Sequence, residues 1–397
     1  MTADISANAK VKPFDAAVCI GRFQPLHLGH LDILQQALAL APRCVVVIGS
    51  AQQARTPKNP FTWAERADMI VQALAPPDRQ RVQFLPMRDY YDEARWAAAV
   101  RTGVAALLAP EVAAATNLTI ASTSASTAAS TAASTTAATT AAATSTTPPV
   151  TAPTIALVGH AKDASSGYLK AFPDWALVPV ARRLPIDGTP LRDALFGAPA
   201  DLLTAGLPGL VDLVPTSTLD FLRAWVTTAP HAMLLDEWRM LKTYREMWQA
   251  APYPPIFVTA DVVLLCAGQV LLVQRAHAPG RGCWALPGGF VEQLETTLQS
   301  ACRELREETQ IELSEAALLA SHRSSQVFDH PGRSLRGRTI THAHLFDLGA
   351  RDQPAVQAAD DAAALCWQPI DQLTAMEDQF FDDHFHILDR FLGLLPD

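Results

Sequence analysis

The sequence lacks any apolar run long enough to cross a membrane. Its longest uncharged stretch consists mostly of Ala, Ser and Thr, which are too polar to insert readily into a bilayer. The chain also has no excess of positive charge, since its formal net charge is −9, and this argues against nucleic-acid or anionic-membrane partners. The first residues lack the apolar core of a signal peptide. We therefore expect a cytoplasmic protein with no membrane and no nucleic-acid partner.

Cysteine is scarce and scattered. The six cysteines form no C-x-x-C pair and show no spacing typical of metal ligands, and most of them lie in apolar runs. This pattern predicts reduced, buried thiols. A chain of 397 residues is too long for one compact core and predicts two domains. The composition leaves homo-oligomerisation open.

Charged residues are absent between Val112 and Ala161, where no Asp, Glu, Lys or Arg occurs. Most of this stretch is low-complexity sequence with almost nothing to bury, so it cannot offset the entropy lost on ordering. We predict that residues 112–153 are a disordered Ala/Ser/Thr-rich insertion, and that residues 1–14 are a flexible N-terminus. The alternative for the insertion, an alanine-driven helix, is weakened by the interspersed Thr and Ser. The apolar segment 154–159 predicts a buried strand, so the insertion interrupts a domain.

Ahead of the insertion the hydrophobic pattern alternates between strand and helix. Ala16–Ile20 and Cys44–Ile48 are short apolar runs, and between them apolar residues recur at helical spacing, namely Leu31, Leu34, Leu38 and Ala41. Strand, helix and strand at this spacing predict an α/β fold with a parallel sheet and a right-handed crossover. A further helix is expected after Thr62, whose hydroxyl can form a capping box with Glu65.

The second half of the chain begins with a helical segment, Met233–Trp248, which ends in the Pro-rich turn APYPP. After it, Ile256–Cys266 and Gln269–Arg275 predict a hairpin of strands around Ala267 and Gly268. The domain organisation that we predict is a first domain over residues 15–228, a helical linker over 229–253 and a second domain over 254–397.

The first motif, GRFQPLHLGH, runs from Gly21 to His30 and lies between the first expected strand and helix. Glycines permit a tight turn, and a helix N-terminus offers free N–H groups and a positive dipole end. His27 and His30, three residues apart, can face one polyphosphate, and Arg22 adds a fixed positive charge. A lone histidine is more often a satisfied core or surface residue, but the whole string in this turn favours a nucleotide site.

This motif resembles the H-x-G-H signature of the nucleotidyltransferase superfamily, and more specifically the GRFQPxHxGH of archaeal-like nicotinamide-mononucleotide (NMN) adenylyltransferases. The segment Asn59–Arg66 resembles the NPFT-x-x-ER block of the same family. The resemblance covers about residues 15–225 apart from the insertion, and it implies a Rossmann-like fold with ATP and NMN as substrates. The substrate contacts that it implies here are Gly21, Arg22, Phe23, Asp89 and Trp96, the last two at the nicotinamide end.

After the insertion, the sequence from Gly159 resembles the family's GH-x-KD-x-SS-x-YL motif. A ligand at the carboxyl end of a parallel strand is usual in open α/β sheets. The substrate contacts implied are Gly159, Lys162, Asp163, Ser165 and Ser166.

A later helix start is a further expected anion site. Thr189 fits an N-cap, Pro190 fits the first helical position, and Arg192 in the first turn can clamp a triphosphate. This segment resembles the family's ST-x-x-R-type motif, with Gly188 where many members have Ser or Ala.

The mechanism implied by the resemblance has no covalent enzyme intermediate. The phosphate of NMN attacks the α-phosphorus of ATP in line, NAD forms and pyrophosphate leaves. The protein contributes positioning and charge stabilisation. His27, His30 and Arg192 are the residues expected to stabilise the phosphate charge, with Mg²⁺ carried on the nucleotide.

The second motif lies between Gly289 and Ile311 and carries three glutamates on one expected helix. Glu304, Glu307 and Glu308 are spaced i, i+3 and i+4, so their carboxylates project from one side. Like charges at this spacing repel unless a cation lies among them, and carboxylate oxygens suit Mg²⁺ or Mn²⁺. A solvated acidic helix is the alternative, but the upstream glycine-rich loop favours a metal site.

The spacing G-x5-E-x7-REU-x-EE resembles the Nudix box, and the resemblance covers about residues 254–397. It implies an α/β/α sandwich that hydrolyses ADP-ribose, or a related nucleoside diphosphate, to AMP and ribose 5-phosphate. Glu304, Glu307 and Glu308 are the implied metal ligands, and Glu308 is also the implied catalytic residue. Glu295 and Arg303 are expected to orient these ligands.

Two further features surround the Nudix-like box. Gln310 stands where the box has a late glycine, and a left-handed backbone there would cost roughly 1 kcal/mol. Arg333, Arg336 and Arg338 are predicted to bind substrate phosphates, a solvated charged loop being the alternative.

The combined prediction is a bifunctional enzyme of NAD metabolism that binds ATP, NMN and ADP-ribose and uses Mg²⁺ or Mn²⁺. One alternative changes the acceptor to another phosphate monoester; Asp89 and Trp96 argue against it because they suit nicotinamide. A second alternative makes the Nudix-like domain a ligand sensor, which retention of all three glutamates disfavours.

Overall fold

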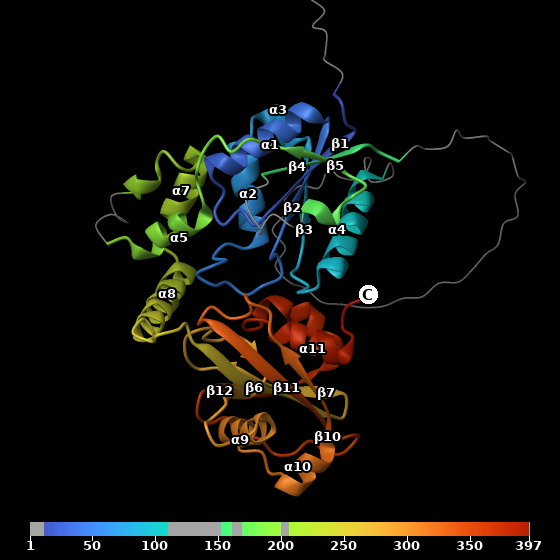
Figure 1. Cartoon of the computed structure of the whole chain (residues 1–397), viewed down its shortest axis with the longest axis vertical. Coiled ribbons are helices and arrows are strands. Elements are labelled where there is room, and N and C mark those ends of the chain that lie inside the picture. The colour runs from blue at the N-terminus through green and yellow to red at the C-terminus, as the bar shows by residue number, and fades with distance from the viewer. Residues whose placement is uncertain (1–11, 110–151, 161–168, 200–205, 397) are drawn as a thin grey trace, which may run out of the picture.

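The computed structural model describes residues 12–109, 152–160, 169–199 and 206–396. Figure 1 shows two layered domains stacked along the long axis, with one long helix beside their junction. The predicted insertion over residues 112–153 and the predicted N-terminus over residues 1–14 lie almost entirely outside the described residues.

The N-terminal domain is built on a five-stranded, all-parallel sheet with the order β3-β2-β1-β4-β5. Its strands are β1 (Ala16–Gly21), β2 (Arg43–Ile48), β3 (Val82–Pro86), β4 (Ile155–Gly159) and β5 (Ala176–Pro179). The central strands are buried on both faces, which explains their continuous apolar sequence. The predicted Rossmann-like parallel sheet is therefore confirmed.

Helices cover both faces of this sheet. They are α1 (Leu28–Leu40), α2 (Trp63–Ala73), α3 (Pro76–Arg79), α4 (Glu93–Leu108), α5 (Gly188–Gly197) and α7 (Thr216–Trp225), with a 3-10 turn η3 (Pro208–Leu210). Alternate strand residues face opposite layers: Val46 packs in the cluster with α1 and α2, and Val45 in the cluster with α4. The capping box of Thr62 and Glu65 is present at the start of α2, as predicted.

Helix α8 (Ala229–Met247) joins the two domains. Leu234 and Trp238 pack against the core of the N-terminal domain. The buried carboxylate of Glu237 accepts a hydrogen bond of 2.6 Å from the backbone N–H of Gly280, in the C-terminal domain. Contacts to both domains explain the mixed polarity of this helix.

The C-terminal domain contains a mixed, seven-stranded sheet with the central order β10-β11-β6-β7-β12. Its strands are β6 (Ile256–Cys266), β7 (Gln269–Arg275), β8 (Trp284–Ala285), β9 (Gly288–Phe290), β10 (His322–Phe328), β11 (Arg338–Asp347) and β12 (Ala362–Pro369). Strands β6 and β7 pair antiparallel across Ala267 and Gly268, so the predicted hairpin is confirmed. Strand β6 also pairs parallel with β11 along its whole length.

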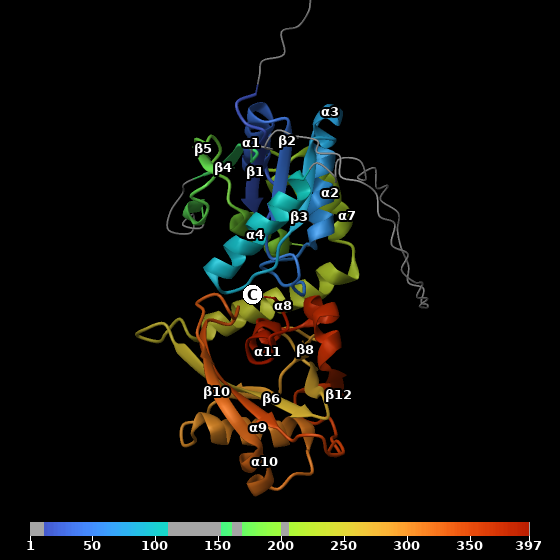
Figure 2. The same cartoon turned by 90° about the vertical axis from the view of Figure 1, so that its right-hand side faces the viewer.

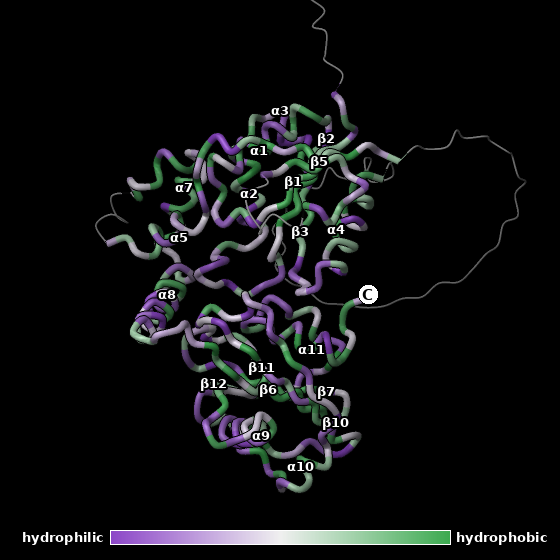
Figure 3. The backbone as a smooth tube through the Cα atoms, in the orientation of Figure 1, coloured by the Kyte–Doolittle hydropathy of each residue, from purple (hydrophilic) through white to green (hydrophobic). Residues whose placement is uncertain are grey.

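Helices again lie on both faces of this sheet. They are α9 (Thr297–Thr309), α10 (Glu315–Ser321), the 3-10 segment η4 (Ile370–Gln379) and α11 (His384–Leu392). Val262 of β6 packs with α9, whereas its neighbour Val263 packs with α11. This alternation gives the predicted α/β/α sandwich, and Figure 3 shows the apolar residues concentrated along the strands. None of the described helices is long and apolar enough to span a bilayer.

Candidate active sites

The first candidate site lies at the carboxyl ends of β1 and β4, where the strand order of the sheet reverses. Open α/β sheets bind ligands in the crevice at such a point. A cavity of about 870 Å³ opens there, and its lining includes Gly21, Arg22, Phe23, His27, His30, Asp89, Trp96 and Gly159. The tertiary structure thus brings together the residues predicted from three separate motifs.

His27 and His30 stack on one another at the start of α1, with ring centroids 3.6 Å apart. The backbone N–H of His30 donates to Nδ1 of His27, so His27 is the N-cap and the motif opens helix α1. Because Nδ1 of His27 accepts this bond, the proton of the neutral ring lies on Nε2, where it can be donated to a phosphate.

Both histidines are neutral hydrogen-bonding groups at physiological pH. Burial lowers the pKa of His27 to about 4, an effect that nearby Asp187 opposes. Burial, helped by His27 itself, lowers the pKa of His30 well below its usual value. Nδ1 of His30 is buried and has no hydrogen-bond partner among the described residues. A polar atom left in this state is suited to a ligand.

Arg22 lines the cavity, whereas the guanidinium of Arg192 lies beside the lining residue Gly188. The guanidinium of Arg192 is buried and donates to the Gln24 carbonyl at 2.7 Å and to the Thr189 hydroxyl at 3.0 Å. Burial lowers the pKa of Arg192 to about 10, and the neighbouring Arg22 contributes. Arg22 has no ion pair within the described part of the chain. Two guanidinium groups close together with no carboxylate between them favour an anion.

The predicted N-cap of this last helix was wrong. Helix α5 begins at Gly188 and its N-cap is Asp187, so Thr189 lies inside the first turn and its hydroxyl binds Arg192 instead. A side chain at position 188 would place its Cβ 2.9 Å from Nη1 of Arg192 and 3.0 Å from the Gln24 carbonyl oxygen. Glycine at position 188 therefore allows Arg192 to approach the loop that contains Gln24. A serine at this position would add a hydroxyl group but would also crowd this contact.

Asp89 is held in the cavity by two polar side chains. Its carboxylate accepts from the Ser50 hydroxyl at 2.7 Å and from the Gln53 amide at 2.9 Å. Trp96 is on the first turn of α4 and packs edge-on against Phe172. The aromatic ring and the carboxylate thus both line the cavity.

Arg66 explains why the NPFT-x-x-ER block belongs to this site. Its side chain is fully buried and donates to the backbone carbonyls of Arg22, Gly49 and Ser50. It therefore ties the loop after β1 to the loop after β2. Phe23, which has a left-handed φ of 53°, contacts His30 edge-on at 4.8 Å.

Several cavity residues were not found from the sequence. His160, directly after β4, is close enough to His27 and His30 to lower the pKa of both, and its Nδ1 is 2.7 Å from the Val180 carbonyl oxygen. Lys58 is half-buried beside Arg22 and Asp89. His160 stands within the motif that begins at Gly159, and Lys58 directly precedes the segment Asn59–Arg66, which was the available signal. Lys162, Asp163, Ser165 and Ser166 lie outside the described residues.

The second candidate site lies where α9 meets the glycine-rich turn around β9. Glu308 is buried, and one of its carboxylate oxygens accepts from the backbone N–H of Gly288 at 3.0 Å. Burial raises the pKa of Glu308 to about 8, and the nearby Glu304 raises it further while the Gly288 bond lowers it. Burial also raises the pKa of Glu304. Two carboxylates crowded into one buried place favour a cation between them.

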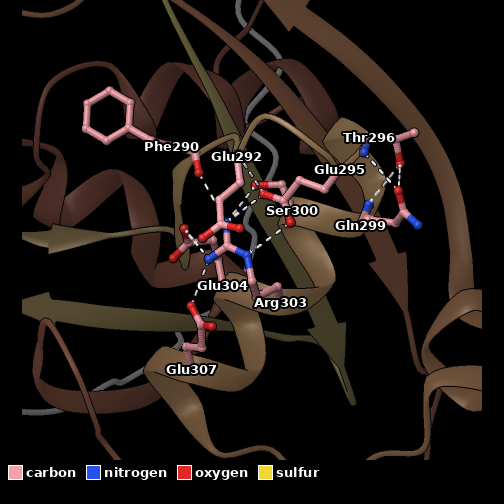
Figure 4. A network of polar contacts seen from close by, with 9 residues as sticks. All are labelled: Phe290, Glu292, Glu295, Thr296, Gln299, Ser300, Arg303, Glu304 and Glu307. Atoms are coloured by element: carbon pink, nitrogen blue, oxygen red, sulfur yellow. Dashed lines mark hydrogen bonds and ion pairs between the residues drawn. The ribbon is translucent and has the colours of Figure 1, made fainter.

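Arg303 is the hub of the surrounding polar network, which Figure 4 shows. It makes ion pairs of 2.7 Å with Glu295, 2.9 Å with Glu304 and 2.8 Å with Glu307. The bonds from Arg303 lower the pKa of Glu295 to about 2. Arg303 thus holds the carboxylate of Glu304 in place and also binds the more exposed carboxylate of Glu307. That it orients metal ligands stays a prediction.

The side chains at this site are of the type that binds a divalent cation, but they are not arranged around one common point. Among the described residues, no three His, Cys, Asp or Glu side chains lie close enough together to hold a metal ion. Glu304 and Glu308 point to the same turn, whereas Glu307 is 47% exposed and bound by Arg303. The donor set of hard carboxylate oxygens is the one that Mg²⁺ and Mn²⁺ prefer.

Gly289 gives a test of this arrangement. A Cβ there would lie 2.4 Å from Oε1 of Glu304, the oxygen that Arg303 binds. We expect Gly289→Ala to displace that carboxylate and lower hydrolysis at this site about tenfold or more, with little change in melting temperature. Gly209→Ala is the matched control, since a Cβ there meets nothing within 4 Å. An unchanged rate of hydrolysis in Gly289→Ala would contradict the assignment of Glu304 to this site.

The three predicted phosphate-binding arginines have different environments. Arg333 is buried and bound at 2.7 Å to Asp383, and Arg338 donates to the Asp329 carbonyl. Only Arg336 of the three has no ion pair among the described residues; it lies over the Phe290 ring, and its Nε is buried without a hydrogen-bond partner in the described part of the chain.

Arg275 and Gln310 complete this region. Burial, and next the neighbouring Arg336, lower the pKa of Arg275, while Glu308 opposes them. Arg275 lies over the Phe381 ring, 4.2 Å from its centroid, and no local motif indicated it. Gln310 ends α9 with a left-handed φ of 44°, so the cost anticipated for a non-glycine residue there applies.

Comparison with known proteins places both sites in context. The family model described as NUDIX domain matches residues 255–391, and the model described as Cytidylyltransferase-like matches residues 18–102. The Nicotinamide/nicotinic acid mononucleotide adenylyltransferase of Acinetobacter baylyi is 28% identical over 227 residues, which cover 57% of this chain and 94% of that protein. The ADP-ribose pyrophosphatase of Methanocaldococcus jannaschii is 34% identical over 124 residues, 31% of this chain and 64% of that protein.

One solved structure is similar over nearly the whole chain. It is the crystal structure of a bifunctional NMN adenylyltransferase/ADP ribose pyrophosphatase from Francisella tularensis. The identity is 30%, the TM-score is 0.77, and the match covers 96% of this chain and 99% of that one. A second structure of the Francisella protein is complexed with AMP and a Mn ion.

Proposed function

This chain belongs to the family of bifunctional NMN adenylyltransferase/ADP-ribose pyrophosphatases, and we propose that each of its two candidate sites performs one of these reactions. The first transfers AMP from ATP to NMN, which gives NAD and pyrophosphate. The second hydrolyses ADP-ribose to AMP and ribose 5-phosphate. The single observation that carries the proposal is the whole-chain match, at 30% identity, to a protein with both activities.

At the first site, His27, His30, Arg22 and Arg192 bind and orient the triphosphate of ATP. The two imidazole rings are neutral, so they can donate hydrogen bonds to the phosphates without placing a buried positive charge of their own in the site. The two guanidinium groups supply the positive charge. The acceptor phosphate is already a nucleophile at neutral pH, so positioning is the main task of the protein.

The acceptor lies at the other end of the cavity. Asp89, fixed by Ser50 and Gln53, accepts from the carboxamide of nicotinamide, and Trp96 offers an aromatic face to the cationic ring. Gly21, Phe23, Gly159 and Thr189 shape the cavity or hold its binding groups, and Lys162, Asp163, Ser165 and Ser166 are proposed to contact the substrates.

At the second site, Glu304, Glu307 and Glu308 would hold Mg²⁺ or Mn²⁺, supported by Arg303 and Glu295. A bound divalent cation neutralises charge on the diphosphate and lowers the pKa of water. The chain itself contributes a buried carboxylate, Glu308, fixed by the Gly288 N–H and able to hold a proton. Arg336 and Arg275 face the substrate phosphates.

The different environments of the three arginines make a prediction. We expect Arg336→Ala to raise KM for ADP-ribose by about tenfold or more, because the guanidinium makes no ion pair among the described residues and a hydrogen bond to a charged group is worth about 1.5–3 kcal/mol. Arg338→Ala should change KM much less, since that side chain is bound to Asp329. Steady-state hydrolysis measures both, and equal effects of the two substitutions would contradict the assignment of Arg336.

The proposal is tested by identifying products. The full chain is incubated with ATP, NMN and Mg²⁺, and separately with ADP-ribose and Mg²⁺, and the products are separated by chromatography. NAD and pyrophosphate in the first reaction, and AMP and ribose 5-phosphate in the second, are expected. Absence of NAD would overturn the transferase assignment. Binding of ADP-ribose without hydrolysis would favour a ligand sensor.

A further inference from the structure

The segment between β3 and α4 carries the acceptor-binding residues and touches the C-terminal domain. We name residues 87–96 the acceptor loop, because Asp89 and Trp96 belong to it. Figures 1 and 2 both show the start of α4 close to the C-terminal domain. Three separate contacts join the loop to that domain.

Two of these contacts are ion pairs with a buried carboxylate. Arg88 lies 2.9 Å from Glu377, whose side chain is 5% exposed. Arg95 lies 3.1 Å from Asp389, whose side chain is 6% exposed, and it also donates to the carbonyls of Leu395 and Pro396. Breaking a pair of this kind leaves an uncompensated buried charge, so each pair holds its loop residue firmly.

The third contact is aromatic. Tyr91 lies between the rings of His330 and His386, with centroid distances of 4.7 and 4.8 Å. Its φ of 52° is left-handed, a conformation that is unfavourable for a residue with a side chain. The surrounding contacts must therefore maintain it, and both rings come from the C-terminal domain.

On its other side the loop faces the first active site. Asp89 follows Arg88 directly and precedes Tyr91 by two residues, and its carboxylate is bound by Ser50 and Gln53. The cavity extends from His27 past Asp89 to His330 and Asp382. One side of the acceptor loop thus carries Asp89, which lines the cavity, and the other side contacts the C-terminal domain.

We propose that the C-terminal domain positions the acceptor loop and so sets the affinity of the first site for its mononucleotide acceptor, with Glu377, Asp389 and His386 as positioning residues. The inference rests on the proposed transferase function. If the C-terminal domain positions the acceptor loop, it affects NMN binding at the first site whether or not the second site hydrolyses its substrate.

The test is a kinetic comparison of full-length variants. NAD synthesis is measured while NMN is varied at saturating ATP, and then while ATP is varied at saturating NMN. Glu377→Gln and Asp389→Asn should each raise KM for NMN about tenfold, while kcat, KM for ATP and ADP-ribose hydrolysis stay within about twofold. Arg88→Lys keeps the charge and should stay close to wild type. Asp347→Asn, in an exposed ion pair with Arg323, is the matched control and should change nothing.

The outcomes separate the possible failures. An unchanged KM for NMN in both carboxylate variants overturns the inference. So does a parallel loss of kcat, of both KM values and of hydrolysis, since that indicates a general structural role. If the Glu377 variant does not fold, Arg88→Gln removes the same ion pair at its less buried partner and is measured in the same way. Absence of NAD synthesis in the wild type refutes the proposed function itself, not the positioning.

Discussion

Replacing His27 or His30 by alanine is expected to lower NAD synthesis by about 10²–10³-fold, the usual cost of losing one preorganised donor to a developing charge. The two rings are stacked in the turn after β1, and each offers a nitrogen to the cavity. The measurement is the initial rate of NAD formation from ATP and NMN.

Hydrolysis of ADP-ribose by the same samples is the internal control. It should remain near the wild-type rate, because both histidines lie in the other domain from α9. His277→Ala, an exposed histidine of the C-terminal domain, should leave both activities unchanged. A His27 or His30 variant that makes NAD at the wild-type rate would show that this turn does not bind the reacting phosphates.

The second large effect concerns Glu308. Glu308→Gln should lower ADP-ribose hydrolysis by orders of magnitude, about 10²-fold or more, while NAD synthesis continues. The substitution keeps the size of the side chain but removes one negative charge from a site that must hold a divalent cation. A neutral amide is a poorer ligand for Mg²⁺ and cannot accept a proton as a base. AMP release across a Mg²⁺ titration, wild type against variant, measures both effects.

The same variant should behave differently without metal. Glu308 is buried close to Glu304 on the same helix, and burial raises its pKa to about 8. Above that pH both carboxylates are ionised, and removing one of two like charges at i and i+4 then relieves about 0.2–0.5 kcal/mol of repulsion. Above this pKa of about 8, the metal-free variant is therefore expected to melt slightly higher than the wild type. Glu312→Gln, at an exposed position after α9, is the control. Equal rates and equal metal dependence in Glu308→Gln and wild type would contradict the assignment of this site.

The sequence alone determined those features whose parts are close together in the chain. The turn from Gly21 to His30, the capping box of Thr62 and the row of glutamates on α9 all depend on contacts within ten residues. Local spacing fixes such contacts, because helix periodicity and backbone geometry are the same in every protein. The strand, helix and strand pattern likewise predicted a parallel sheet.

Local reasoning was wrong where a distant group intervened. Thr189 has the residue type of an N-cap, yet α5 begins at Gly188, beside the carbonyl of Gln24 in the first phosphate loop. Nothing in the sequence around Thr189 shows that this loop is there. The same reason explains why Arg333 is bound to Asp383, fifty residues later in the chain, while Arg336 stays without an ion pair among the described residues.

Only the tertiary structure decided how the two halves share a cavity. His160 joins His27 and His30 because β4 lies next to β1 in the sheet. The acceptor loop meets Glu377 and Asp389 because the C-terminal domain packs against the start of α4. These contacts join residues separated by more than one hundred positions, and their pairing depends on which surfaces bury together. Periodicity along the chain contains no information about that choice, since many side chains could pair equally well until packing brings two of them within reach.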